Sequence, residues 1–149
     1  MDTEAASTLL FETLAHAVAG NNEQAATGLQ TLGSQSDDNQ MYGVCFGLAN
    51  VGTMMLNRIY GDRAPKPENG DMWALHQLKP GAFDTDPPQA FASRFLVAHA
   101  NGDTGTEMAL FNAALASEGN QYVDSVCALL ADVAGLCRLA RDRSSGSAP

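Results

Sequence analysis

Basic residues are scarce in this chain, and their absence from its first part excludes one class of function. The sequence holds eight Lys and Arg against 17 Asp and Glu, which gives a formal net charge of −9. No Lys or Arg precedes Arg58, whereas six Asp and Glu lie within residues 1–57. Because nucleic-acid binding depends on Lys and Arg that neutralise phosphates, we expect no nucleic-acid partner. An acidic inhibitor that acts by surface mimicry is one alternative, with residues 1–40 as its acidic face.

Cysteine is also scarce, and no segment has the composition of a membrane span. The three cysteines are an odd number without C-x-x-C spacing, which does not fit a disulfide framework and favours the cytoplasm. The N-terminus reads Met-Asp-Thr-Glu, unlike the basic start of a secretory signal. The longest uncharged stretch, residues 39–57, is interrupted by Asn, Gln, Thr and Gly, which is typical of a buried core helix. We therefore expect no membrane association.

The common sequence signatures of catalysis and metal binding are missing. The sequence contains no P-loop, no G-x-S-x-G and no H-E-x-x-H or C-x-x-C spacing. We therefore predict no metal, no cofactor and no catalytic residue. Catalytic groups that meet only in space leave no such signature, so the question of an enzyme stays open, with the balance against one.

No segment alternates apolar and polar residues with the period of a strand, and the sequence predicts an all-α fold of about seven helices. Gly, Pro and cap residues mark the ends of the apolar periodicity. Capping boxes are predicted at Asn21–Gln24, Asp37–Gln40 and Thr104–Glu107. The predicted helices span residues 3–19, 22–32, 38–60, 72–78, 87–100, 104–118 and 120–143.

The two halves of the chain resemble each other at an offset of 82 residues. The dipeptide Asn39-Gln40 also recurs as Asn120-Gln121, one residue out of step. The matched positions are Leu14 with Leu96, Gly20 with Gly102, and Val44-Cys45 with Val126-Cys127.

This similarity predicts a duplicated three-helix unit within one domain, residues 1–143. The units span about 3–60 and 86–143, and a loop-rich segment with one short helix, 61–85, connects them. Two such units would bury their long third helices against each other, as a helical bundle or a short repeat array. Residues 144–149 are predicted to be a disordered tail.

Three glycines in the third predicted helix, Gly43, Gly47 and Gly52, require an explanation because each costs about 1 kcal/mol relative to alanine. Close packing against another helix is the favoured explanation. A ligand that lies on the glycine face is the alternative. Cys45 and Cys127 fall on the apolar stripes of their helices, where we expect them to pack in the core.

Four residues are the candidates for binding a ligand or a partner: Trp73, His76, Arg94 and His99. Trp73 either anchors the connecting segment to the helices or forms part of a lid over a groove between the halves. Arg94 could pair with Asp86 or hold an anion. His99 lies at a helix end, where a favourable interaction with the helix dipole is the simpler interpretation.

These observations predict a non-catalytic, acidic, helical protein-interaction domain with an adaptor or regulatory role. Its partner would be another protein or a second copy of the chain in a homodimer. The arginines near the C-terminus suit the end of a helix, or could meet the acidic half of another copy. The alternative is a small-molecule-binding protein or enzyme with a pocket between the two halves, lined by the four candidate residues.

Overall fold

The structure, a computed structural model, describes residues 1–74 and 86–146, and confirms the all-α fold with two helical halves. Within these residues there are six α-helices, two short 3-10 helices and no strand. The first half consists of α1 (Thr3–Val18), α2 (Asn22–Gln35) and α3 (Asp38–Tyr60), followed by η1 (Gly61–Arg63) and η2 (Pro67–Asn69). The second half consists of α5 (Pro87–Ala100), α6 (Thr104–Leu115) and α7 (Gln121–Gly146).

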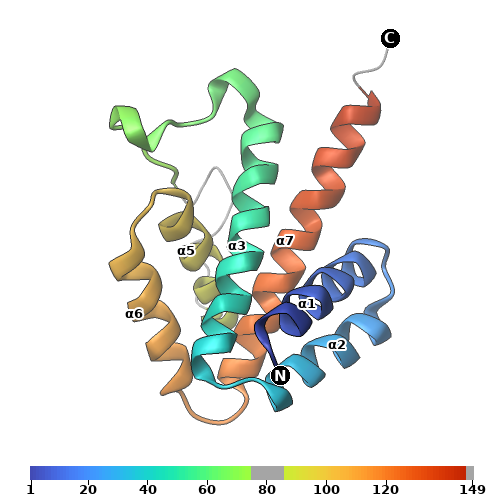
Figure 1. The fold of residues 1–149 in the computed structure, drawn as a ribbon. Coiled ribbons are helices and arrows are strands. Elements are labelled where there is room, and N and C mark those ends of the chain that lie inside the picture. Colours follow the sequence, from blue (N-terminus) through green and yellow to red (C-terminus); the bar gives the residue numbers. More distant parts are fainter. Residues whose placement is uncertain (75–85, 147–149) are drawn as a thin grey trace.

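The long helices α3 and α7 form the centre of the molecule. They run side by side in the same direction, with the α1–α2 hairpin on one side and the α5–α6 hairpin on the other (Figure 1). The most extensive helix contacts are those of α7 with α5 and with α3, and α7 also packs on α1. The predicted burial of the two long helices against each other is therefore confirmed, with α7 as the most contacted helix.

The turn of each hairpin has the same geometry at the predicted offset of 82. Gly20 and Gly102 end α1 and α5 with φ of +82° and +72°. In both turns the backbone N–H that follows the glycine donates to the carbonyl five residues earlier, at 2.8 Å. This bond satisfies a carbonyl at the helix end, and the left-handed glycine makes the reversal possible.

The long helices match at an offset of 81 instead, so the pairing of Val44-Cys45 with Val126-Cys127 is wrong. Cys45 is buried, whereas Cys127 is exposed. The offset of 81, which aligns Asn39-Gln40 with Asn120-Gln121, is the one that aligns the buried positions of α3 with those of α7. Those buried positions are Val44 with Ser125, Cys45 with Val126, Leu48 with Leu129, Ala49 with Leu130, and Gly52 with Val133.

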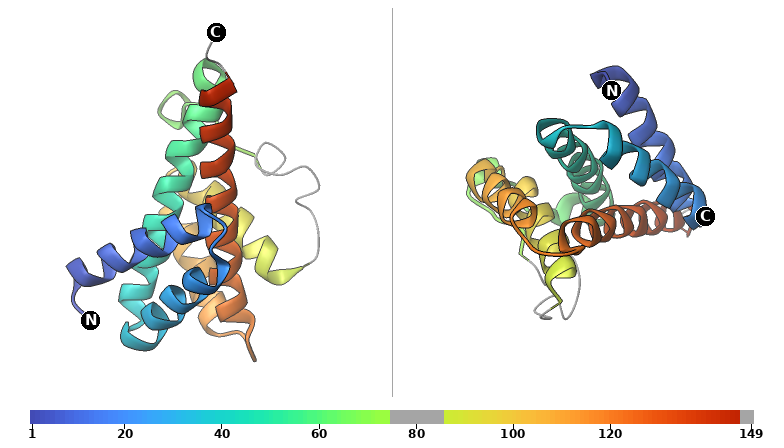
Figure 2. Two further views of the ribbon diagram at one scale, coloured as in Figure 1. Left: turned by 90° about the vertical axis from the view of Figure 1, so that its right-hand side faces the viewer. Right: turned by 90° about the horizontal axis from the view of Figure 1, so that it is seen from below.

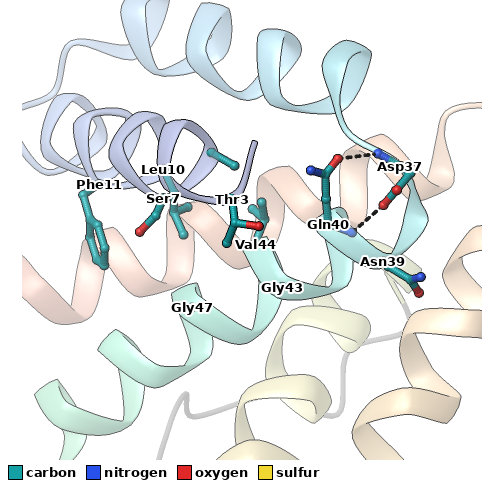
Figure 3. A pocket seen from close by; sticks show the side chains of 11 residues that line it. Thr3, Ser7, Leu10, Phe11, Asp37, Asn39, Gln40, Gly43, Val44 and Gly47 are labelled. Carbon is teal, nitrogen blue, oxygen red and sulfur yellow. Dashed lines mark hydrogen bonds between the residues drawn. The ribbon is translucent and has the colours of Figure 1, made fainter. Parts of the chain in front are cut away.

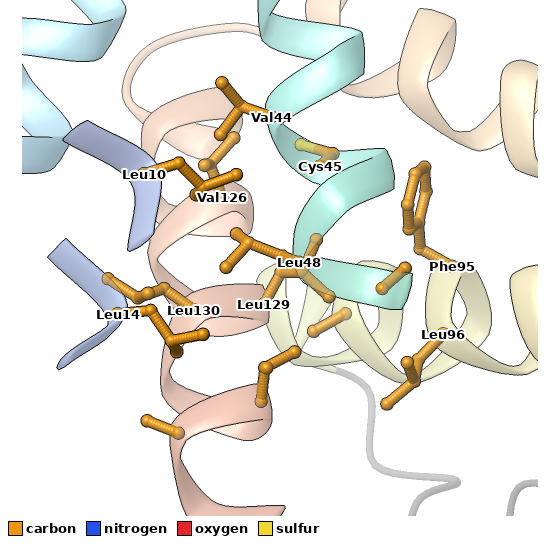
Figure 4. Packing of buried hydrophobic residues seen from close by; sticks show 14 of the residues in the cluster. Leu10, Leu14, Val44, Cys45, Leu48, Phe95, Leu96, Val126, Leu129 and Leu130 are labelled. Carbon is orange, nitrogen blue, oxygen red and sulfur yellow. The ribbon is translucent and has the colours of Figure 1, made fainter. Parts of the chain in front are cut away.

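The core lies where α1 and α5 meet the two long helices (Figure 4). Leu48 of α3 and Leu129 of α7 are fully buried at its centre. Gly52 explains how tightly α3 packs, because a Cβ at this position would lie 2.7 Å from Leu96 Cδ1. Close packing, the favoured explanation for the glycines, is thus confirmed at Gly52.

Two arginines of α7 hold the C-terminal ends of helices in the first half. Arg138 Nη1 donates to the carbonyl of Ala17 in α1 at 3.0 Å, and Arg143 Nη1 donates to the carbonyl of Ile59 in α3 at 3.2 Å. A cation at a helix C-terminus is stabilising, because the last carbonyls have no partner within their own helix. The structural interpretation of these arginines is confirmed, although the helices they cap belong to the other half.

The capping box is confirmed at Asp37–Gln40, where both reciprocal hydrogen bonds are present. It is wrong at Asn21, whose side chain makes no capping hydrogen bond. It is also wrong in α6, where Asp103 is the N-cap and its carboxylate accepts from the backbone N–H of Thr106 at 3.2 Å. This bond, together with the Thr106 hydroxyl, lowers the pKa of Asp103.

The ends of two predicted segments differ from the structure. Met72–Ala74 of the predicted short helix are not helical, and the remainder of that helix lies outside the described residues. The backbone of α7 stays helical to Gly146, where the sequence predicts a disordered tail from residue 144. The helix therefore continues from its last charged residues into the small polar residues at 144–146.

Candidate functional site

An open groove lies between α1 and α3, and we call it the α1–α3 groove (Figure 3). It encloses a cavity of about 460 Å³. Its lining residues come only from the first half of the chain: Thr3, Ala6, Ser7, Leu10, Phe11, Asp37, Asn39, Gln40, Gly43, Val44 and Gly47. The groove exists because α1 packs more extensively on α7 than on α3.

Two of the three α3 glycines form the wall of this groove. At Gly47 a Cβ would lie 2.9 Å from Leu10 Cδ2, so this glycine lets α1 approach α3. At Gly43 a Cβ would meet nothing within 4 Å, so the bare backbone faces open space. The packing explanation therefore holds for Gly47, and Gly43 is free to contact an occupant of the groove.

An exposed aromatic side chain stands at the edge of the groove. Phe11 on α1 is 53% exposed and lines the cavity. Phe46 and Met54, 43% and 58% exposed, lie three and eleven residues after Gly43 and therefore on the same outer face of α3. Large apolar side chains grouped on one face are typical of a surface that contacts another molecule.

Among Asp, Glu, Lys and Arg, only the acidic types occur in the segment that forms the groove, and the N-terminal ammonium of Met1 donates to the carbonyl of Gln35 at 3.0 Å. Residues 1–57 include no Lys or Arg, and their acidic residues are Asp2, Glu4, Glu12, Glu23, Asp37 and Asp38. Asp37 lines the groove itself, where its carboxylate accepts from the backbone N–H of Gln40 at 2.8 Å (Figure 3). An occupant that carries positive charge is therefore favoured over one that carries negative charge.

His99 belongs to a polar cluster that joins three helices and is buried on the side of Glu107, whereas Asn50 is exposed. Its Nδ1 lies 2.9 Å from Glu107 Oε1 on α6, and its Nε2 lies 3.0 Å from Asn50 Oδ1 on α3. The side chains of His99 and Glu107 are 9% and 2% exposed. Phe46 packs edge-on against the imidazole, with ring centroids 4.6 Å apart. Because both imidazole nitrogens already face an oxygen atom, the cluster is suited to holding α5, α6 and α3 together.

A nucleophilic role for the neighbouring thiol is disfavoured. Burial raises the pKa of Cys45 to about 12, with a further contribution from the Glu107 carboxylate. The thiolate is the reactive form of cysteine, so this side chain stays protonated and inert near neutral pH. The cluster thus has the components of an acid–base pair without an activated nucleophile.

Trp73 anchors the connecting segment to α5, as the simpler of its two interpretations predicts. It is 3% exposed, and its ring packs against Tyr60 with centroids 5.4 Å apart. Its backbone N–H donates to Asn101 Oδ1 at 2.6 Å, and Asn101 Nδ2 donates to its carbonyl at 3.1 Å. The side-chain amide of Asn101 therefore satisfies both backbone polar groups of Trp73.

The structure does not bring the other candidate residues to a common site. Arg94 is exposed on α5, and no ion pair joins it to Asp86 or to another residue in the described ranges. No hydrogen bond, ion pair or ring contact in the described part of the chain links any two of Trp73, Arg94 and His99. His76 lies outside the described residues. A binding role for these four residues stays a prediction.

The described ranges hold no group of three or more His, Cys, Asp and Glu side chains arranged for a metal ion. Within the same ranges, every helix is too short or too polar to cross a lipid bilayer.

Comparisons with known proteins find no family model, no curated protein and no solved structure that matches this chain.

Sequence reasoning missed two features of these sites. The sequence gives no sign that Phe11 is exposed, because an aromatic residue at this position of α1 would also fit a buried face. Glu107 was assigned to a cap, and its distance of eight residues from His99 gives no hint of contact until α5 and α6 form a hairpin. Gly43 was recognised, since its cost in a helix requires compensation.

Proposed function

We propose that this chain is a non-catalytic, acidic, helical protein-interaction domain that binds a basic amphipathic helix of a partner protein in the α1–α3 groove. The observation that carries the proposal is that the open backbone of Gly43 and the exposed ring of Phe11 line one groove, in a segment without Lys or Arg. An amphipathic helix that lays its apolar face in a groove is a common mode of recognition.

Each part of the groove has a role in this binding. Gly43 lets the backbone of an incoming helix approach closely, because no side chain separates the two helices. Phe11 supplies the aromatic anchor, the type of side chain that dominates interface energies. Asp37 in the groove and the other acidic residues of residues 1–57 attract a basic helix and accelerate its association, an effect that salt weakens.

A separate partner is favoured over a second copy of this chain. A second copy would bring the same net charge of −9, and only three of its eight Lys and Arg lie near the end of α7. The homodimer and the cytoplasmic location stay predictions from the sequence, and self-association is one outcome of the experiment below.

The test uses two labelled helical peptides with the same leucine face, one with Lys and one with Glu on the other face. Fluorescence anisotropy measures their affinity for the protein and for the variant Gly43→Leu. We expect the Lys peptide to bind about tenfold more tightly than the Glu peptide. Gly43→Leu should weaken the Lys peptide about tenfold, because its side chain fills the groove.

The matched control is Gly105→Leu, the same change at an exposed helix glycine on α6, where a Cβ meets only Asp103 Oδ1 at 3.9 Å. Gly43→Leu replaces glycine inside a helix, so the variant should fold at least as stably as the original chain. Equal affinity for both peptides, or equal weakening by both variants, would contradict the proposal. A dimer in sedimentation analysis that Gly43→Leu dissociates would assign the groove to a second copy instead.

A further inference from the structure

A second groove lies on the other side of α1, between α2 and α7, and we call it the α2–α7 groove. It consists of two adjoining cavities of about 540 and 230 Å³, which share Ala26, Leu29 and Cys127 as lining residues. The first half of α7 runs beside α2 (Figure 2). Ligand pockets typically measure about 300–1,000 Å³, so the groove is large enough for a small molecule.

The groove is long and predominantly apolar. Along α7 it extends from Tyr122 to Arg138, which is about 24 Å at the rise of an α-helix. Its apolar surface is formed by Leu29, Val126 and Leu130. The alanines of both helices have short side chains, which leave the groove open along its length. This shape fits an extended chain better than a compact ring system.

One charged residue lines the groove in the described part of the chain, and it is a cation. Arg138 stands at the end that also holds Asn22, and neither cavity is lined by an acidic side chain. One N–H of the guanidinium donates to the carbonyl of Ala17. An arginine carries five N–H donors in a fixed fork that matches a carboxylate, so further donors remain for a ligand. Although the chain has a net charge of −9, the one charged residue that lines this groove is a cation at one end. The groove therefore favours a ligand with an anionic head group at that end and an apolar remainder.

From this arrangement we infer that the α2–α7 groove binds a long-chain carboxylate of the fatty-acid type. Its carboxylate pairs with Arg138 beside Asn22, and its acyl chain lies along α7 past Leu130 and Val126 toward Tyr122. The apolar lining removes the acyl chain from water, which provides most of the affinity. The site is separate from the α1–α3 groove, so the two can be tested independently.

Cys127 supplies a reporter within the groove. This exposed thiol lies where the two cavities join, so a bound acyl chain would cover it. Cys137 lies outside the lining of both cavities and serves as the internal control, while Cys45 is buried. The rate of maleimide labelling at each cysteine can be followed by mass spectrometry of peptides.

The experiment measures the affinity of palmitate and of its methyl ester, both below their micellar concentrations, by displacement of a fluorescent polyene fatty acid. We expect palmitate to bind about tenfold more tightly than the ester, since only the acid forms charge-assisted hydrogen bonds. Arg138→Gln, which keeps a donor for the Ala17 carbonyl, should remove this preference, and Arg138→Lys should retain part of it. Palmitate should slow the labelling of Cys127 several-fold and leave Cys137 unchanged.

A second variant fills the groove and leaves Arg138 unchanged. Ala26→Phe places a ring at the junction of the two cavities and should abolish binding of palmitate and of the ester. Ala109→Phe makes the same change at an exposed alanine of α6 and should bind as the original chain does. Equal affinity for acid and ester, unaltered binding by Ala26→Phe, or labelling of Cys127 unaffected by palmitate would overturn the inference. Circular dichroism of each variant separates these results from a failure to fold.

Discussion

The hairpins α1–α2 and α5–α6 share their turns and many of their buried positions, but they pack at different tightness and leave different surfaces open. At the offset of 82, Thr13 and Gly28 of the first hairpin correspond to Phe95 and Leu110 of the second. The small pair lets α1 and α2 approach closely, and these helices contact each other more extensively than α5 and α6 do. The first hairpin is therefore the tighter one internally, while the second is held more firmly to α7.

The two hairpins also differ in the polar residues that hold them to the central helices. His99 and Glu107 occupy the positions that Ala17 and Ala25 occupy in the first hairpin. The second hairpin is thus tied to α3 by a polar cluster, and the first relies on apolar packing and on Arg138 from α7. This difference teaches that two similar helical units can differ in what holds them to the centre while their turn geometry stays the same. Both grooves lie beside the hairpin that lacks the cluster.

The largest expected effect comes from breaking the polar cluster. Glu107→Ala removes the partner of a buried histidine and should lower the free energy of unfolding by about 3–5 kcal/mol. Urea unfolding followed by circular dichroism measures it. The double variant His99→Ala with Glu107→Ala copies the first hairpin, and it should cost clearly less than the sum of the single changes. Additive costs would show that the two side chains do not stabilise each other.

The next effect tests the close approach in the first hairpin. A Cβ at Gly28 would lie 2.1 Å from Thr13 Oγ1, so Gly28→Ala should destabilise the chain by about 1–3 kcal/mol. Adding Thr13→Ala should recover much of the loss, because it removes the atom that clashes. Gly33→Ala in the same helix has open space around it and should stabilise instead. A stabilising Gly28→Ala, measured in the same urea titration, would refute the close approach.

A smaller effect distinguishes the two cysteines that the sequence pairs. The folded chain raises the pKa of Cys45 to about 12 from 9.0. Between these values the unfolded chain loses the thiol proton and the folded chain keeps it, so stability falls as pH rises. The loss should be about 1 kcal/mol between pH 9 and pH 10. Urea unfolding of Cys45→Ala should show a correspondingly shallower pH dependence. Cys127→Ala should show a smaller change in the same direction, because burial raises the pKa of Cys127 as well.

The smallest effect concerns the open glycine of the α1–α3 groove. Gly43→Ala should raise the free energy of unfolding by up to about 1 kcal/mol, because alanine favours the helix and meets no neighbour. Gly52→Ala should destabilise, since its Cβ would crowd Leu96 at 2.7 Å. Thermal unfolding measures both. If Gly43→Ala lowers the melting temperature, Gly43 is not open, and if Gly52→Ala raises it, Gly52 is not crowded.

Much of the fold could be predicted from the sequence because its signals are local. Apolar residues at helical spacing, and glycines at the ends of α1 and α5, define the helices and the hairpin turns. The capping box at Asp37 is equally local and is present. In α6 the same reasoning failed, because Asp103 and Thr104 both offer a cap. The choice depends on Glu107, which the fold uses to bind His99.

The candidate sites were much less predictable. Gly43, Gly47 and Gly52 look equivalent in the sequence, yet one faces open space, one faces Leu10 and one faces Leu96. Trp73 was the most conspicuous candidate because it is the single tryptophan, and the structure uses it to anchor a segment. The two grooves could not be foreseen, since each depends on how far one helix stands from another.

The sequence by itself determined most of the helices, their turns, the division into two helical halves and the lack of Lys and Arg in residues 1–57, because these follow from spacing and composition along the chain. Only the tertiary structure decided which long helix became central, which cysteine was buried and which glycine remained open. These features depend on the angle and distance at which distant helices pack. A shift of one residue between the hairpins and the long helices was enough to bury Cys45 and expose Cys127.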